Sequence, residues 1–249
     1  MGVNHVTTAD GEELINLMSD TVNENNLLED ETAHAANGEA IVGKAKYINP
    51  NLIINPDFSI NQRGQTEYSG FGYTVDGWFN RAYYVDTTIL AKGIRITYYN
   101  TEMAINWIYQ IVESLKAGTY TLSMKIRKSR PDLSVRCYEG YTKASTDWQI
   151  IKSPINMSSD GSLTFTLATT DSGLASGDWI EIEWTKLELG SVATPFVKPN
   201  PALESIKCQR MLQYHTIGDI NPVDLRPIMR ITPSIVQQAD GRWMYNAEL

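Results

Sequence analysis

Apolar and polar residues alternate with a period of two from Asn51 onward, and this alternation constrains the fold of the 249-residue chain more than any other feature. The alternating stretches are rich in Ile, Val, Thr, Tyr and Trp, and Gly, Asn, Asp and Pro separate them at short intervals. This pattern is typical of short strands joined by turns. With 42% hydrophobic residues the chain can bury a full core, so we expect an all-β sandwich.

Nine segments are predicted to be strands. They are Leu52–Ser59, Trp78–Val85, Gly93–Tyr99, Trp107–Glu113, Gly118–Lys128, Leu133–Glu139, Trp148–Lys152, Ser162–Ala168 and Trp179–Leu189. Alternate residues of the fifth strand should face the core, namely Tyr120, Leu122, Met124 and Ile126. In the last strand the apolar pattern changes face near Trp184, which indicates a bulge.

The N-terminal region differs from the rest in charge, because residues 1–46 hold nine acidic and two basic side chains, a net charge of −7. Residues 10–28 are predicted to form a short helix with Asp10 as its N-cap. Its small apolar face, too short to be stable alone, consists of Leu14, Ile15, Leu17 and Met18. We expect these four residues to attach the segment to another protein or to further copies of the chain.

The C-terminal region is predicted to contain a second helix within residues 202–215. Its apolar face would carry Cys208, Met211, Leu212 and His215. The last residues read as two strands joined by a turn at Asp240–Gly241. The predicted organisation is therefore an attachment segment (1–46), a sandwich (47–198) and a C-terminal helix with a hairpin (199–249).

Composition argues against several classes of function. The acidic balance disfavours nucleic-acid binding, and the one basic cluster is interpreted as a solvated strand edge rather than an anion site. That cluster is Lys125, Arg127, Lys128 and Arg130. Cys137 and Cys208 have neither zinc nor disulfide spacing and are expected to be reduced and buried. No secretion signal or membrane span is recognisable, so we expect synthesis in the cytosol without membrane insertion.

No catalytic or cofactor-binding pattern is evident. GxSxG, HExxH and phosphate-binding Gly loops are missing, and the only histidines are His5, His34 and His215. For His34 a role in a turn is preferred to metal binding. Asp57 and Glu188 could share a calcium ion if the first and last strands pair, although two solvated carboxylates are the simpler interpretation. We expect no enzyme, no cofactor and no metal, while paired carboxylates for glycoside cleavage stay open.

Several strings of residues together indicate a family. NLIINPDFSINQRG (51–64), YTVDGW (73–78), AGTYTLSMKIR (117–127), KLELGSVATPF (186–196) and ESIKCQRMLQYH (204–215) resemble, in this order, the carbohydrate-binding-like domains of phage and prophage tail proteins. LLEDETAHAANGEAIVGKA (27–45) resembles a linker of phage structural proteins. The resemblance implies a jelly-roll domain displayed on a virion, often trimeric, with Trp78 in its core. It does not distinguish tail, baseplate and head.

Sugar binding would require exposed aromatic rings that stack on pyranose faces. The candidates are Trp107, Tyr109, Tyr83, Tyr84, Tyr98, Tyr99 and Trp148, although an aromatic residue of a sandwich strand more often belongs to the core. Three functions remain in competition. The first is adhesion to a host-surface glycan by a homotrimeric tail or head fibre, the second a purely structural fibre protein, and the third a polysaccharide depolymerase.

Overall fold

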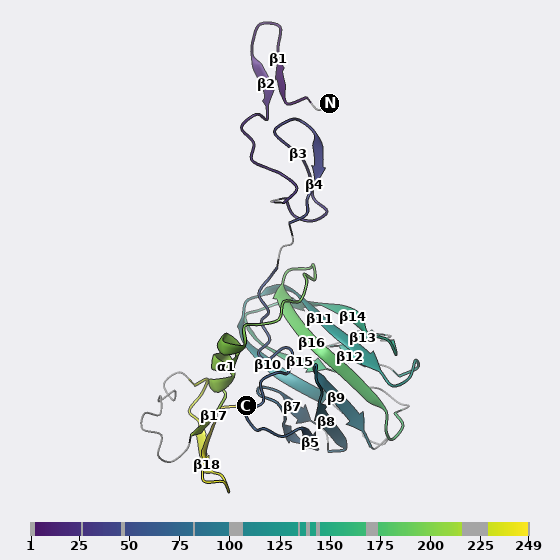
Figure 1. Ribbon diagram of the computed structural model, residues 1–249, viewed down its shortest axis with the longest axis vertical. Helices are drawn as coiled ribbons and strands as arrows, with labels where there is room; N and C mark the ends of the chain where they lie inside the picture. Colours follow the sequence, from purple (N-terminus) through teal and green to yellow (C-terminus); the bar gives the residue numbers. More distant parts are fainter. Residues whose placement is uncertain are drawn as a thin grey trace. The chain divides into compact units, whose positions relative to one another are not determined.

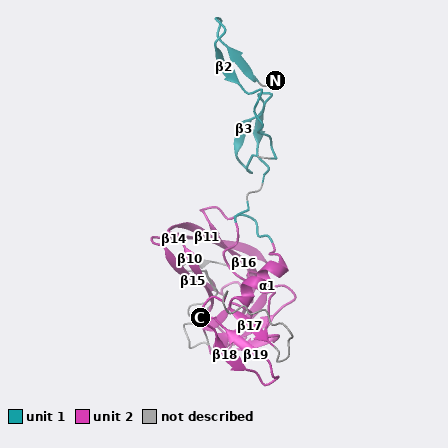
Figure 2. Ribbon diagram, turned by 90° about the vertical axis from the view of Figure 1, so that its left-hand side faces the viewer, with its two compact units in different colours: residues 1–49, 194–197 teal, residues 50–193, 198–249 magenta. Residues whose placement is uncertain are grey.

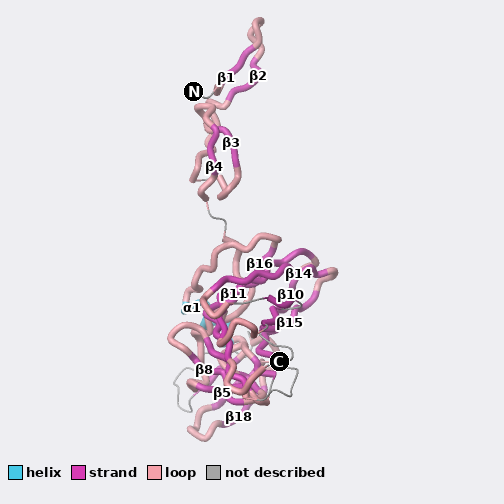
Figure 3. The backbone as a smooth tube through the Cα atoms, turned by 90° about the vertical axis from the view of Figure 1, so that its right-hand side faces the viewer, coloured by secondary structure: helices cyan, strands magenta, loops and turns pink. Residues whose placement is uncertain are grey.

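The computed structural model describes residues 3–25, 27–45, 48–81, 83–99, 107–133, 135–137, 140–142, 145–167, 174–215 and 229–248. The chain divides into two compact units (Figure 2). One comprises residues 1–49 with 194–197, and the other comprises residues 50–193 with 198–249. Strands make up most of the regular structure of the larger unit (Figure 3).

The larger unit contains, in its described part, two six-stranded antiparallel sheets (Figure 1). Sheet one has the order β13 (Gly140–Thr142), β12 (Val135–Cys137), β15 (Gly161–Leu167), β10 (Trp107–Leu115), β7 (Phe79–Arg81) and β6 (Gly72–Tyr73). Sheet two has the order β14 (Gln149–Met157), β11 (Gly118–Lys128), β16 (Trp179–Leu189), β9 (Ile94–Tyr98), β8 (Val85–Ile89) and β5 (Glu67–Ser69). The chain crosses repeatedly between the sheets, as in a jelly roll, and the predicted all-β sandwich is confirmed.

The predicted strand β11 has the expected bounds and lies between β14 and β16. Its four apolar side chains are buried in the core between the sheets. The bulge is confirmed as well, because Lys125 pairs with Trp184 whereas Ile126 pairs with Ile182, which leaves Glu183 as the extra residue. Gly93 is packed against this bulge, where a Cβ would lie 1.9 Å from the Ile182 carbonyl oxygen.

Two predicted strands are wrong. Residues 52–59 are irregular, because Asn55 and Phe58 adopt positive φ angles of 52° and 58° and Pro56 has no N–H for a ladder. The predicted strand from Trp78 to Val85 ends at Arg81, and a strand of the other sheet begins at Val85. Other predictions differ only in length, and β14 extends through Pro154 because it is an edge strand.

The predicted C-terminal helix is shorter than expected. Helix α1 covers Pro201–Gln209 and is capped by Asn200, whose side chain accepts hydrogen bonds from the N–H groups of Ala202 (3.0 Å) and Leu203 (3.3 Å). A turn at Arg210 and Met211 follows the helix, and the chain then enters strand β17 (Leu212–His215). His215 therefore lies on a strand, where it packs against Tyr245. Pairing with β19 outweighs the helical periodicity of the sequence.

The predicted hairpin is confirmed. Strands β18 (Ser234–Gln237) and β19 (Trp243–Asn246) flank the Asp240–Gly241 turn, and β19 lies between β17 and β18 in a three-stranded sheet. This sheet and α1 lie beside the sandwich (Figure 1). The C-terminal region therefore packs against the sandwich within the same compact unit.

A buried polar network connects the C-terminal region to the sandwich. The N–H of Asn55 donates to Glu204 Oε1 at 2.6 Å, and the Asn55 amide donates to the Asp76 carbonyl at 3.1 Å. Trp78 is fully buried, as expected, and its indole N–H donates to the Asn55 carbonyl at 3.0 Å. Gln62 connects Asp76 (2.6 Å) to the Leu212 carbonyl (2.7 Å). The network joins three of the sequence strings that carry the family resemblance.

The smaller unit contains two short hairpins in place of the predicted helix. Strand β1 (His5–Thr7) pairs with β2 (Glu13–Asn16), and β3 (Thr32–His34) pairs with β4 (Ala40–Val42). The prediction of a helix N-cap at Asp10 is wrong, because Asp10 lies in the turn between β1 and β2. There Gly11 has a φ of 90° and its N–H donates to the Thr8 carbonyl at 3.0 Å. A turn containing Asp-Gly competes directly with helix initiation.

Candidate functional site

Five aromatic rings form a continuous series on sheet one, and we call them the aromatic strip. They are Tyr109, Tyr73, Phe79, Phe71 and Tyr83. Phe79 contacts the rings of Tyr109 at 5.3 Å and of Tyr73 at 4.8 Å between centroids. Phe71 then contacts Phe79 edge-on at 4.9 Å and stacks on Tyr83 at 5.2 Å. Such edge-on and stacked pairs hold one another in place.

Strand register explains why these rings meet. Phe79 of β7 pairs directly with Tyr73 of β6 on one side and with Tyr109 of β10 on the other. Residues opposite one another on neighbouring strands share a face of the sheet. On the same strand Ile108 is buried in the core, so Tyr109 faces away from it. The strip is therefore a cross-strand row on the outer face of sheet one, continued by Phe71 and Tyr83.

The inner end of the strip opens into a pocket of about 300 Å³. Tyr73, Phe79 and Tyr109 form one side of it, together with Ile111 and Glu113 of β10. Residues of the C-terminal region complete the lining, and we call them the C-terminal wall. The wall consists of Lys207, Arg210, Met211, Arg230 and Glu248. Phe71 and Tyr83 lie outside the pocket lining and are 51% and 67% exposed.

The charged groups at the pocket are mostly paired. Arg230 forms an ion pair with Glu113, and Lys207 with Glu204 at 2.9 Å. Glu248 forms an ion pair with Arg63 and also accepts the Gly77 N–H at 3.1 Å. Burial raises the pKa of Glu248 against the opposing effect of Arg63. The contacts of Arg230 and Glu248 hold the wall against the sandwich, whereas the Lys207–Glu204 pair lies within α1.

Two lining residues of this pocket bear on what it can bind. Arg230 Nη2 is buried and has no hydrogen-bond acceptor among the described residues. Glu248 has a side chain only 1% exposed, which suits a structural anchor and not an acid that reaches a substrate. The pocket thus combines aromatic faces with an arginine donor, the combination that fixes a polar ligand with apolar faces.

The basic cluster on β11 is not a solvated edge, because β11 is an interior strand. Lys128 is buried and its Nζ donates to the carbonyls of Pro131 (2.8 Å) and Leu133 (2.6 Å). The other three cations are paired with carboxylates, Lys125 with Glu183, Arg127 with Glu181, and Arg130 with Asp178. The cluster therefore contributes to structure and does not present free cations for an anion.

Trp148 immediately precedes β14, an edge strand of sheet two, and lies beside this paired cluster. The Arg127 guanidinium is 4.8 Å from the Trp148 ring centroid and 5.7 Å from that of Trp179. Lys125 Nζ is 5.5 Å from the Trp148 ring. The Trp148 ring is thus already engaged by two cations, which compete with a stacking sugar for the ring.

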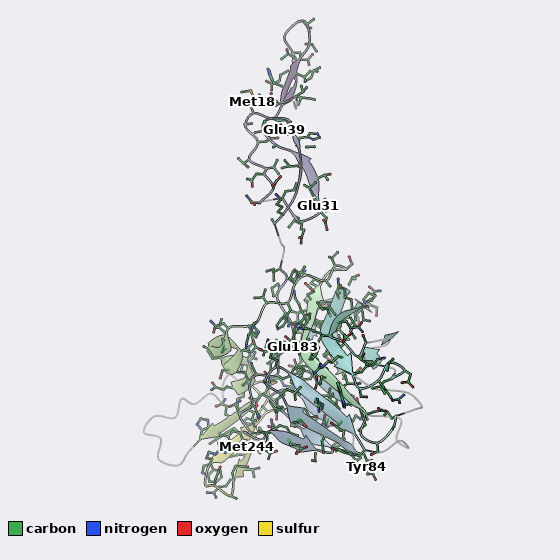
Figure 4. All side chains as sticks on the ribbon, turned by 45° about the vertical axis from the view of Figure 1, so that its right-hand side comes forward. Met18, Glu31, Glu39, Tyr84, Glu183 and Met244 are labelled. Carbon is green, nitrogen blue, oxygen red and sulfur yellow. The ribbon has the colours of Figure 1, made fainter. Side chains whose placement is uncertain are left out.

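The other aromatic residues predicted as ligand contacts fall into different positions. Tyr109 and Tyr83 belong to the strip. Tyr98 is fully buried in the core, so its prediction is corrected: alternation along β9 points its ring inward. Tyr84, labelled in Figure 4, and Tyr99 are about half exposed, and the Tyr99 N–H donates to the Tyr84 carbonyl at 3.0 Å. The side chain of Trp107 lies outside the described residues.

Sequence reasoning missed Phe71, Tyr73 and Phe79. Of these three residues of the string FGYTVDGWF, only Phe79 falls within a predicted strand, and nothing in the string indicated that neighbouring strands would place the rings side by side. The aromatic clustering around Gly72 was the one available signal.

The described part of the chain shows neither a metal-binding cluster nor a membrane-spanning helix. It contains no group of three or more His, Cys, Asp or Glu side chains placed to hold a metal ion. Asp57 pairs with Lys198 at 3.5 Å, and Glu188 pairs with Lys186 at 3.1 Å. Cys208 is buried as expected, while the Cys137 side chain lies outside the described residues. No helix among these residues is long and apolar enough to cross a bilayer.

Comparison with known proteins finds no matching family model and no matching curated protein. Solved structures with a similar arrangement are carbohydrate-binding modules. A CBM4 module is 14% identical with a TM-score of 0.36, covering 55% of this chain and 98% of its own. A module of a Cellvibrio mixtus lichenase in complex with cellotriose is 14% identical with a TM-score of 0.34, covering 57% and 100%.

A third such structure is the CBM22 xylan-binding domain from Paenibacillus barcinonensis. It is 15% identical with a TM-score of 0.34 and covers 60% of this chain and 100% of its own. At these values the similarity transfers neither a ligand nor the role of any residue.

Proposed function

We propose that this chain is a non-enzymatic glycan-binding protein displayed on a bacteriophage particle. The observation that carries the glycan part is the aromatic strip, whose outer rings are exposed and whose inner rings enter a pocket. Pyranose rings have apolar C–H faces that pack on aromatic rings and hydroxyl groups that need hydrogen-bond partners. The strip offers aromatic rings for the C–H faces, and the pocket offers the Arg230 donor for a hydroxyl group.

The proposed attachment to the particle is argued from the exposed apolar residues of the smaller unit. None of the described hydrophobic residues before Asn49 belongs to the buried core, and Leu14, Ile15 and Met18 are exposed, whereas Leu17 is partly buried. Met18 and Glu39 project from this unit in Figure 4. Ordering a chain costs about 1–2 kcal/mol per residue, and these hairpins bury little apolar surface to offset that cost. A partner surface on the particle supplies the missing burial.

The virion role and a homotrimeric assembly extend the resemblance of the sequence strings to phage tail proteins. Trimerisation would combine three weak sites into useful avidity on a cell surface. Deleting residues 1–46 should abolish incorporation into particles while leaving the β-sandwich circular dichroism spectrum intact. Loss of that spectrum would contradict the division into attachment segment and displayed domain.

A purely structural fibre protein is the second candidate. The buried polar network is the observation that favours a structural role. Asn55, Asp76 and Glu204 come from three of the resembling strings, and all three form internal hydrogen bonds. Those strings therefore have a structural explanation that needs no ligand. Only the strip and the pocket distinguish the two functions.

A microbial glycan array and whole-cell binding with the full chain test the proposal. The double variant Phe71→Ala, Tyr83→Ala should weaken binding about 20-fold or more, because each ring contributes about 1 kcal/mol of stacking. Trp148→Ala removes an aromatic residue from the other sheet and is the matched control. Loss of binding by the Trp148→Ala variant alone would indicate that the site lies beside sheet two. Absence of binding by the unmodified chain would favour the structural fibre protein. Product analysis of bound glycans should detect no cleavage.

A further inference from the structure

We infer that the pocket receives the terminal sugar residue of a glycan whose following residues lie along the aromatic strip toward Tyr83. This inference rests on the proposed glycan binding and adds the mode of recognition. A strip open at both ends would accept the interior of a long polymer. A strip closed at one end accepts a chain only with its end at the closed side.

The C-terminal wall closes the inner end of the strip. Tyr73, Phe79 and Tyr109 line the pocket together with Met211 and Arg230, whereas Phe71 and Tyr83 lie beyond it. The ring contacts run outward from Phe79 through Phe71 to the exposed Tyr83. A glycan that follows these rings inward therefore meets the wall.

The wall is held by contacts that do not depend on a ligand. Its backbone segments pair with one another, since the Arg230 N–H donates to the Arg210 carbonyl at 2.8 Å and the Ala247 N–H to the Met211 carbonyl at 2.7 Å. Glu248 is anchored to Arg63 and Gly77 of the sandwich. A wall held at several points does not yield to let a polymer pass.

The size and polarity of the pocket fit one end of a glycan. Its volume of about 300 Å³ lies at the lower limit for ligand pockets and leaves room for a short terminal portion, not for a folded-back chain. A terminal residue also has a hydroxyl that an interior residue uses in its glycosidic bond. The buried Arg230 Nη2, which lacks an acceptor among the described residues, is a donor for such an oxygen.

The test uses oligosaccharides printed on an array in two orientations, each tethered once through its reducing end and once through its non-reducing end. We expect every oligosaccharide that binds the unmodified full chain to bind in one orientation, at least about tenfold more strongly than in the other. Equal binding in both orientations would overturn terminal recognition and leave glycan binding standing. Binding to no oligosaccharide in either orientation would contradict both.

Two variants test whether the terminal sugar residue binds in the pocket. Ile111→Trp should fill the pocket from β10 and reduce binding at least about tenfold without altering Phe71 or Tyr83. Arg230→Gln, which keeps a shorter donor, should weaken binding by about tenfold. Both variants are checked for an unchanged melting temperature. Unchanged binding by a folded Ile111→Trp variant would show that no sugar enters the pocket.

Discussion

Arg63 and Glu248 lie 185 positions apart and form an ion pair in which the side chains are 12% and 1% exposed. The pair fastens the end of the described chain to the turn that carries Arg63, and Glu248 also accepts the N–H of Gly77 from a second turn. It thereby fixes one side of the pocket. The stability of the C-terminal region and the shape of the candidate site thus depend on the same contact.

Removing one partner of this pair should be costly. Arg63→Ala leaves Glu248 buried beside Gly77 without its cation, and we expect the free energy of unfolding to fall by about 3–5 kcal/mol. Urea denaturation followed by tryptophan fluorescence measures the change. Lys116→Ala breaks an exposed, solvent-screened pair with Asp160 and should cost far less. Equal effects of the two substitutions would show that the buried pair is not an anchor.

The bulge in β16 requires glycine at position 93. Gly93→Ala introduces a Cβ that would clash with the Ile182 carbonyl, and its φ of 76° is unfavourable for alanine. Gly64→Ala has a similar φ of 70° but open space around its Cβ. We expect a loss of about 1 kcal/mol for Gly64→Ala and at least about 2 kcal/mol more for Gly93→Ala. Thermal melts of both variants check the difference, and indistinguishable melts would argue against the close approach.

Asp178 should make part of the stability depend on acid pH. Burial alone would raise the pKa of Asp178, but hydrogen bonds from Arg130, the Ala175 N–H and Ser129 lower it below 3.8. A carboxyl whose pKa is depressed in the folded state contributes stability above its unfolded pKa, and this contribution is lost as pH falls through the folded pKa.

Asp178→Asn should therefore destabilise the protein by about 2 kcal/mol at pH 7 and progressively less below pH 3.8. Urea unfolding across this pH range measures the convergence. Asp160→Asn, at an exposed position, should show a much smaller difference at pH 7. A constant gap between Asp178→Asn and the unmodified protein would contradict the linkage.

Cys208 should be protected from thiol reagents while the C-terminal region is docked. Burial raises the pKa of the Cys208 thiol and the side chain is fully buried, so little thiolate is available to react. In a Cys137→Ser background, labelling by a disulfide reagent should be slow in buffer and fast in urea. Adding Glu248→Gln should accelerate labelling in buffer, since it weakens the anchor. Rapid labelling of the unmodified region would show that Cys208 is accessible.

The sequence alone predicted those elements in which local patterning and tertiary packing agree. Alternation identified β11 and β16 with their full bounds, and the change of face near Trp184 identified the bulge. The Asp240–Gly241 turn identified the final hairpin. In each case one face of the element is buried, so the period of the sequence reports the structure directly.

Predictions failed where long-range contacts override local preference. Residues 10–28 and 212–215 have helical spacing, yet the first segment contains only strand β2 (Glu13–Asn16) and the second is strand β17. An Asp-Gly turn closes the first hairpin, and β19 pairs with the second segment. Helical propensity amounts to tenths of a kcal/mol per residue and yields readily to such pairing.

The candidate site shows the same division. Sequence reasoning selected Tyr83 and Tyr109 as exposed aromatics, but it also selected the buried Tyr98 and omitted Phe79. An aromatic residue has the same identity in a core and on a surface, and only strand register decides which rings become neighbours. The sequence determined that the chain forms a β-sandwich rich in aromatic residues. The tertiary structure decided that Phe79 joins Tyr73 to Tyr109, and that Glu248, held by Arg63, closes the pocket beside them.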